Sequence, residues 1–230
     1  MGILRSSGDL ELPHNRLSGR GNLAASRAAE TIRCRQLLAD LLRPLDAVSA
    51  PEWADLLIDA FGTLAGVFAS EISAKMRVLG ANHPAHFLES VREAILHSLR
   101  TAAFAGPVLS TAQAVIDYLR MDLAFSPVEH VRVLFLDAQN HLLKDVLVGL
   151  GSASEVPISS REIMRRAVCL NAAGLILVHN HPSGDPSPSG SDRAATAIVA
   201  KAAQTLDVRL HDHLIVGRAG WMSFRQLGLL

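Results

Sequence analysis

The spacing of apolar residues changes along the chain, and this change divides the sequence into regions of different expected structure. From residue 29 to 105 the apolar residues recur every three or four positions, which predicts a series of amphipathic helices. Beyond Gly106-Pro107, short apolar runs of strand type alternate with helical stretches. Residues 1–28 show neither pattern and are rich in glycine and serine. We therefore expect a mobile tail (1–28), a helical domain (29–105) and an α/β domain (107–230).

The α/β domain is expected to hold a mixed sheet covered by helices. A capping box at Ser159 and Glu162 begins one helix, and another is expected to span about residues 189–206. The expected strands cover residues 131–136, 142–150, 175–179 and 208–216, with a short last strand near 221–224. Helices that alternate with strands in one unit predict layers of helix and sheet around a common core.

One stretch carries most of the chemistry, the segment LILVHNHPSGDPSPSGSD that ends at Asp192. Alternate residues of a strand point to the same side, so His179 and His181 share a face, about 6–7 Å apart at the backbone. Two imidazoles at that spacing can bind one ion with Zn–N bonds of about 2.0–2.1 Å. Asp192 follows after a Pro/Gly/Ser turn and can add an oxygen ligand. Three protein ligands with a fourth position left for water are typical of a catalytic zinc site.

Charge and composition narrow the function classes. The chain has 22 basic and 22 acidic residues, eleven of each in residues 1–105 and eleven of each in 106–230. Neither half has the basic excess expected of a strong nucleic-acid binder, and aromatic residues make up only 4%. Cys34 and Cys169 lie in helical apolar patterns and are expected to be buried free thiols. With no apolar run of membrane-spanning length, we expect a cytoplasmic protein with no membrane contact.

The spacing within that segment resembles a known family motif. Seven residues separate His181 from Ser189, and two more precede Asp192. This is similar to the JAMM motif of the MPN-type metallopeptidases, and the strings LNAAGLILVHNHPSG and HNHPSGDPSPS resemble the RadC family. The resemblance implies a cytidine-deaminase-like α/β/α domain that uses Zn²⁺ to hydrolyse a peptide or isopeptide bond in a protein substrate. His179, His181 and Asp192 would be the metal ligands.

A hydrolase of this kind needs a carboxylate beside the water to move its proton. The candidates are Glu129, Glu155, Glu162 and Asp185. Glu162 is expected to act in the capping box and Asp185 to shape the turn, while Glu155 is the second choice as base. The resemblance favours Glu129, because JAMM enzymes place their glutamate at the start of an early strand about this far upstream of the first histidine.

Ser189 has two roles open to it. By the resemblance it matches the JAMM serine, whose hydroxyl can support the oxyanion of the reaction. Its spacing to Asp192 also fits the N-cap and third residue of a helix.

A second His-x-His pattern, His211-Asp212-His213, is interpreted differently. RadC-like chains usually have Asp-His at the last two positions, so Asp212 and His213 are expected to support the site from behind. His211 stands where that family has an apolar residue, and a role as an additional ligand is the weaker alternative.

Three other functions compete with hydrolysis. The RadC resemblance implies a helix-hairpin-helix in the helical domain and a link to DNA repair, but the expected hairpin, VLGANHP, keeps only Gly80 of its glycines. DNA binding is therefore the first alternative function, although the balanced charge of the chain does not support it. A metal-stabilised interaction module without catalysis is the second alternative. Zinc-dependent base deamination is the third and weakest, since the chain has no Pro-Cys-x-x-Cys pair.

Overall fold

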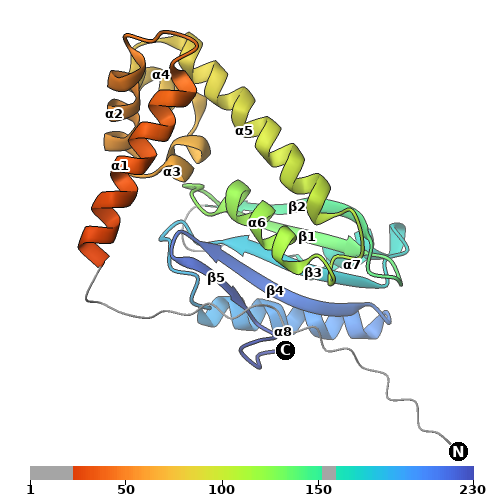
Figure 1. Ribbon diagram of the computed structural model, residues 1–230. Helices are drawn as coiled ribbons and strands as arrows, with labels where there is room; N and C mark the ends of the chain where they lie inside the picture. Colours follow the sequence, from red (N-terminus) through yellow and green to blue (C-terminus); the bar gives the residue numbers. More distant parts are fainter. Residues whose placement is uncertain (1–22, 152–158) are drawn as a thin grey trace, which may run out of the picture.

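The computed structural model describes residues 23–151 and 159–230 and shows a helical N-terminal part joined to a helix-covered sheet (Figure 1). The N-terminal helices are α1 (Leu23–Leu42), α2 (Ala50–Phe61), α3 (Leu64–Ala69), α4 (Ile72–Leu79) and α5 (Asn82–Ala103). Their apolar faces meet in one core, in which Leu38, Leu57 and Leu88 are fully buried. Helix α1 begins at Leu23, so residues 23–28 are helical where we expected the tail. Residues 1–22 lie outside the described part of the chain.

The expected hairpin is the junction of α4 and α5. Gly80 ends α4 in the left-handed region, at φ +62°, which a glycine adopts without strain. Lys75 of α4 is fully buried and donates hydrogen bonds to the carbonyls of Phe68 and Ser70, which end α3. Its ammonium also pairs with Glu89 at 3.0 Å. Lys75 therefore stabilises the helical core. DNA contact at this hairpin stays the alternative to a purely structural helical bundle.

The C-terminal part is a five-stranded mixed sheet in the order β2-β1-β3-β4-β5. Its strands are β1 (Glu129–Leu136), β2 (Leu142–Gly151), β3 (Gly174–Asn180), β4 (Arg209–Gly217) and β5 (Gly220–Ser223). Its helices are α6 (Ala112–Leu123), α7 (Ser160–Cys169) and α8 (Gly190–Thr205). Strands β3 and β4 pair in parallel, and the other neighbours pair antiparallel. The parallel pair requires a crossover, which α8 provides.

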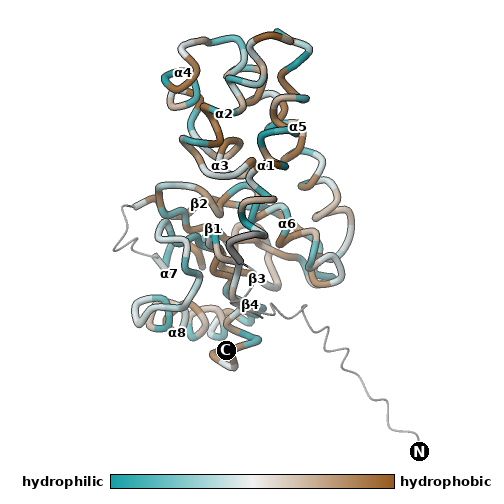
Figure 2. Tube along the Cα trace, turned by 60° about the vertical axis from the view of Figure 1, so that its left-hand side comes forward, coloured by the Kyte–Doolittle hydropathy of each residue, from teal (hydrophilic) through white to brown (hydrophobic). Residues whose placement is uncertain are grey.

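The alternation of side chains along the strands builds two cores, one on each face of the sheet. Leu134 and Ile176 belong to the cluster that packs with α6, whereas Phe135 and Leu177 belong to the cluster with α7 and α8. Figures 1 and 2 show α6 on one side of the strands and α7 and α8 on the other. The three-layered α/β/α arrangement expected from the sequence is therefore confirmed.

A chain of ion pairs, here called the ion-pair network, joins the helical part to the sheet. It consists of Lys75, Glu89, Arg92, Arg100, Asp122, Arg132 and Asp145. Arg132 of β1 lies at its centre, between Asp122 of α6 and the fully buried Asp145 of β2. Nearby anions, Asp145 first among them, raise the pKa of Arg132 although burial opposes the charged form. The network ties α4, α5 and α6 to the first two strands.

Two further expectations have different outcomes. Cys34 is a buried free thiol as expected, but Cys169 is exposed, because it lies off the buried stripe of α7 that holds Ile163 and Ala167.

Within the described ranges, no helix combines the length and the apolar character that crossing a bilayer requires.

Candidate metal centre

The parallel strand pair and its crossover helix position the three predicted metal ligands. His179 lies near the end of β3, and the backbone N–H of His181 donates to Val216 O of β4 at 2.9 Å, which continues the ladder by one residue. The two histidines therefore keep the common face that a strand gives to alternate residues. Asp192 lies in the first turn of α8, which begins where the turn after His181 ends.

The ligand atoms lie close together. His179 Nε2 is 2.9 Å from His181 Nε2. Asp192 Oδ1 is 3.3 Å from His179 Nε2, and Asp192 Oδ2 is 3.4 Å from His181 Nε2. The group is largely buried, with 1%, 18% and 12% of the His179, His181 and Asp192 side chains exposed. No other such group of metal-binding side chains is found in the described part of the chain.

The tautomer of His181 is fixed by a main-chain carbonyl. Its Nδ1 lies 2.8 Å from Asp185 O, which can only accept, so Nδ1 carries the proton. The neutral ring therefore directs the lone pair of Nε2 toward His179 and Asp192. Hydrogen bonding to Asp192 raises the pKa of His181, with burial opposing it, because the carboxylate favours a cation at this position.

Asp192 is held by a complete capping box at the start of α8. Ser189 Oγ accepts from the N–H of Asp192 at 3.1 Å, and the carboxylate accepts from the N–H of Ser189 at 2.7 Å. The Ser189 hydroxyl also donates to Asp192 Oδ2 at 2.6 Å. Burial opposes ionisation, but the neighbouring His179 and His181 side chains and the Ser189 hydroxyl keep the pKa of Asp192 well below its usual value. The carboxylate is thus charged and oriented.

The turn between His181 and Ser189 is packed tightly against the end of β4. Gly184 has φ +92°, and its carbonyl accepts from the N–H of Ala219 at 2.9 Å. A Cβ on Gly217 would lie 2.4 Å from that carbonyl oxygen, so only glycine fits there. Arg218 donates to Ser183 O at 2.8 Å. These contacts fix the path of the chain between the second histidine and the helix that carries Asp192.

The three side chains are close enough together to bind one metal ion. Ligands with bonds of about 2.0–2.1 Å at tetrahedral angles are about 3.3 Å apart. The two histidine–aspartate separations, each to a different carboxylate oxygen, are 3.3 and 3.4 Å, and the histidine–histidine separation is shorter, at 2.9 Å. Two imidazoles and one carboxylate, with the rest of the shell supplied by water, form a donor set that suits zinc.

Glu129 begins β1 on the same face as the two histidines. Val131 pairs with His179 across the antiparallel ladder, and continuing that register by two residues places Glu129 opposite His181. Residues that pair in this way have Cβ atoms about 4.5–5.5 Å apart. The negative charge of Glu129 also contributes to the raised pKa of His181. The carboxylate therefore lies beside the ligands without belonging to their group.

The other candidate bases have other surroundings. The Glu162 side chain pairs with Arg165 at 2.8 Å and Arg166 at 2.6 Å, so it does not complete the capping box we expected, although Ser159 does cap α7. These pairs lower the pKa of Glu162 to about 2. Asp185 accepts from Ser187 and shapes the turn, as expected. Glu155 lies outside the described residues.

The second His-x-His pattern divides into three separate roles. His213 is fully buried, and its Nε2 lies 2.8 Å from His179 Nδ1, directly behind the site. Asp212 accepts hydrogen bonds from Ser223 and from the backbone N–H groups of Arg225 and His213, so it holds both the chain after β5 and the backbone of His213. His211 lies apart from the ligands, and its buried Nδ1 has no hydrogen-bond partner among the described residues.

Two polar residues of the site were not singled out from the sequence. Asn180, between the two histidines, is fully buried and hydrogen-bonds to the backbone on both sides of Glu129. Thr196, one helical turn after Asp192, is buried against His213. The sequence signals that could have pointed to them were the position of Asn180 as a polar residue in an otherwise apolar strand and the position of Thr196 four residues after Asp192.

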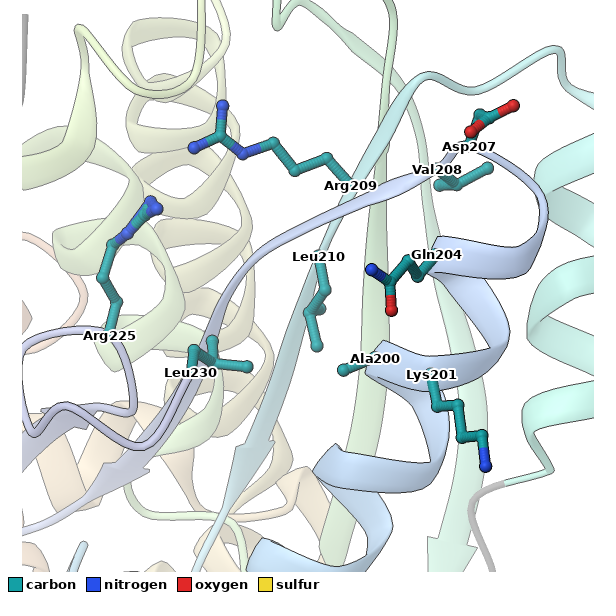
Figure 3. A pocket seen from close by; sticks show the side chains of 9 residues that line it. All are labelled: Ala200, Lys201, Gln204, Asp207, Val208, Arg209, Leu210, Arg225 and Leu230. Atoms are coloured by element: carbon teal, nitrogen blue, oxygen red, sulfur yellow. The ribbon is translucent and has the colours of Figure 1, made fainter. Parts of the chain in front are cut away.

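A separate hollow lies between the second half of α8, the start of β4 and the chain end (Figure 3). Lys201 and Gln204 of α8 and Arg209 of β4 are among its lining residues, and none of the three predicted ligands is. The hollow is therefore distinct from the metal centre.

Fold and site together define a JAB/MPN-type α/β domain, with a buried His-His-Asp group at the junction of a central strand and its crossover helix. A family model described as the RadC-like JAB domain matches residues 109–229, more than half of the chain. The chain belongs to this family.

Curated relatives agree with this assignment. A UPF0758 protein of Rhodobacter capsulatus is 40% identical over 191 residues, which cover 83% of this chain and 89% of that protein. A UPF0758 protein of Ruegeria pomeroyi is 37% identical, with 83% and 85% covered. A UPF0758 protein of Methylibium petroleiphilum is 38% identical over 221 residues, with 95% and 96% covered. The similarity to this last protein extends over nearly the whole of both chains.

Proposed function

We propose that this protein is a zinc-dependent hydrolase that cleaves a peptide or isopeptide bond in a protein substrate. The observation that carries the proposal is the buried group of His179, His181 and Asp192, whose possible ligand atoms all lie within 4.8 Å of one another. These residues would hold the ion, which when bound supplies Lewis acidity and a water molecule of lowered pKa.

Glu129 is the proposed general base and acid. It would take the proton of the attacking water and return it to the leaving amine, which a carboxylate beside the metal and not bound to it can do. Continuing the β1–β3 register by two residues beyond the Val131–His179 pair places Glu129 opposite His181, which supports this role.

Ser189 is proposed to support the oxyanion of the scissile carbonyl. Its hydroxyl donates to Asp192 Oδ2 and caps α8. It would have to exchange the first of these bonds for one to the substrate oxygen.

We also infer that the protein acts in the cytoplasm. Both of its cysteines, Cys34 and Cys169, are free thiols, which is typical of a reducing compartment.

The first test is the metal content of the purified full-length chain. Elemental analysis should find one zinc per wild-type chain and a loss of zinc in His179→Ala and in Asp192→Ala. Glu129→Gln and the control Glu162→Gln should keep their zinc. A wild-type chain that binds no zinc under saturating conditions would remove the basis of the proposal.

The second test is catalysis. The zinc-loaded protein should hydrolyse members of a panel of peptides and lysine-linked isopeptides, and Glu129→Gln should lower the rate by about 10²–10⁴-fold without loss of metal. Glu162→Gln should retain the wild-type rate. If Glu129→Gln and wild type turn over equally, Glu129 is not the base. If a zinc-loaded wild type cleaves nothing in the panel, an interaction module becomes the better interpretation.

A further inference from the structure

A line of buried hydrogen bonds runs behind the metal centre and connects two of its ligands. His179 Nδ1 lies 2.8 Å from His213 Nε2, and His213 Nδ1 lies 2.6 Å from Thr196 Oγ1. Thr196 Oγ1 lies 2.5 Å from the backbone carbonyl of Asp192. His179, His213 and Thr196 are each at most 1% exposed, so water does not compete for these bonds.

The direction of every bond in this line follows from its last member. The carbonyl of Asp192 can only accept, so the single proton of the Thr196 hydroxyl is donated to it. Thr196 Oγ1 must then accept from His213 Nδ1–H. A neutral His213 consequently has a bare Nε2, which accepts from His179 Nδ1–H. The Nε2 of His179 is left unprotonated and faces His181 and Asp192.

We propose that His213 and Thr196 are positioning residues that set the tautomer of His179 and hold it in register with the helix turn carrying Asp192. The proposal rests on the proposed function, since it assigns these residues to the zinc site. It goes further because it makes two ligands from different elements, β3 and α8, parts of one hydrogen-bonded unit. A threonine that bonds to the carbonyl four residues earlier is common in helices, but here the same oxygen also accepts from a buried imidazole.

The packing of His213 supports a fixed ring orientation. Its ring stacks on Phe224, with centroids 4.6 Å apart and an interplanar angle of 28°. The ring is therefore held from the side as well as from its two nitrogen atoms. Partners of this kind orient metal-bound histidines, and their loss typically weakens metal binding by about 10–100-fold.

The test compares zinc affinity across matched variants of the full chain, measured by competition with a fluorescent chelator. Thr196→Val keeps the shape but removes the hydroxyl, and should weaken zinc binding by about 10–100-fold. Thr196→Ser keeps the hydroxyl and should bind within about threefold of wild type. Equal affinity of Thr196→Val and wild type, or equal weakening by valine and serine, would overturn the proposal.

Variants of His213 test its hydrogen bond to His179 separately from its bond to Thr196. His213→Gln supplies an amide oxygen that can accept near the former Nε2, so it should preserve more affinity than His213→Phe, which keeps only the stacked ring. His211→Phe is the control, because it makes the same change two residues away where no ligand is contacted. The proposal is overturned if His211→Phe and His213→Phe weaken zinc binding equally. If His213→Phe does not fold, the Thr196 pair still decides.

A readout that needs no metal distinguishes this proposal from the proposed function. Long-range ¹H–¹⁵N spectra of the zinc-free protein should show a neutral His213 protonated at Nδ1 and His179 protonated at Nδ1. If these tautomers are found in a chain that binds no zinc, the hydrolase proposal fails while the hydrogen-bonded unit remains. A His213 protonated at Nε2 would contradict the unit itself.

Discussion

Replacement of Asn180 by leucine is predicted to loosen the start of β1, where Glu129 lies. The Asn180 side chain accepts from the N–H of His130 at 2.9 Å and donates to Val128 O at 3.0 Å. Leucine has a similar volume but can form neither bond. The two backbone groups that lose their partner flank Glu129 directly, so the change acts on the proposed base without altering a metal ligand.

The size of the effect follows from the surroundings of these two bonds. Asn180 is fully buried, whereas Val128 is exposed and His130 is half-buried. Water can therefore partly replace the lost partners, and each bond is worth about 0.5–1.5 kcal/mol. We expect Asn180→Leu to lower the free energy of unfolding by about 1–3 kcal/mol, which shifts the urea midpoint by about 1 M.

The assay combines urea unfolding with amide hydrogen exchange. The His130 amide should exchange faster in Asn180→Leu, while amides in the centre of β3 should change only with global stability. Asn180→Asp is a second variant, since it keeps the acceptor for His130 but places a second oxygen against Val128 O. It should be destabilised at neutral pH and partly recover at low pH, where a protonated carboxyl can donate. Unchanged exchange at His130 together with an unchanged urea midpoint in Asn180→Leu would refute the reasoning.

Three further predictions concern other parts of the fold. Arg132→Met leaves Asp122 with only the Arg92 guanidinium and Asp145 with only that of the half-exposed Arg100, and should cost about 1–3 kcal/mol in urea unfolding, less than the about 3–5 kcal/mol of a fully broken buried pair. A cost below about 1 kcal/mol would show that Arg132 is not the centre of the network. Burial, together with nearby arginines, lowers the pKa of His211 to about 4, so the native state loses stability as pH falls from about 6.5 toward 4. At pH 5 this loss is about 2 kcal/mol, and His211→Phe should remove it, so parallel stability curves for the two proteins from pH 7 to 5 would refute the assignment. Gly217→Ala places a Cβ 2.4 Å from the Gly184 carbonyl oxygen and should weaken zinc binding about tenfold, whereas Gly190→Ala, with open space around its Cβ, should not. Equal zinc affinity of the two alanine variants would show that the turn tolerates the displacement.

The sequence was most informative where local pattern determines structure. The strand that carries His179 and the capping box of Ser189 and Asp192 follow from rules that span only a few residues, and both are present in the structure. The spacing of the motif also singled out three side chains that lie together in the structure. Short-range geometry of this kind does not depend on the rest of the fold.

Interactions between distant segments were not accessible in the same way. The sequence around Lys75 does not show that its side chain is buried and donates to a carbonyl at the end of the preceding helix. The same local pattern fits a solvent-exposed lysine. The contact of Thr196 with His213 depends on how α8 lies over β4, which no local rule fixes. Cys169 was placed inside because it is apolar, although the final turn of α7 turns it outward. The Glu162 carboxylate pairs with Arg165 and Arg166 of its own helix, whereas we expected it to accept from the backbone N–H of Ser159.

The placement of the ligands along the chain has a consequence for how such a site changes over evolutionary time. The three predicted metal ligands all come from the uninterrupted span His179 to Asp192, whereas Glu129 lies on β1, which pairs with β3 on the side away from β4. If the proposed function is correct, metal binding and proton transfer are thus encoded in separate pieces of the gene. On the proposed function, a descendant can lose turnover through one change in the earlier piece and still retain its zinc, surviving as an inert scaffold.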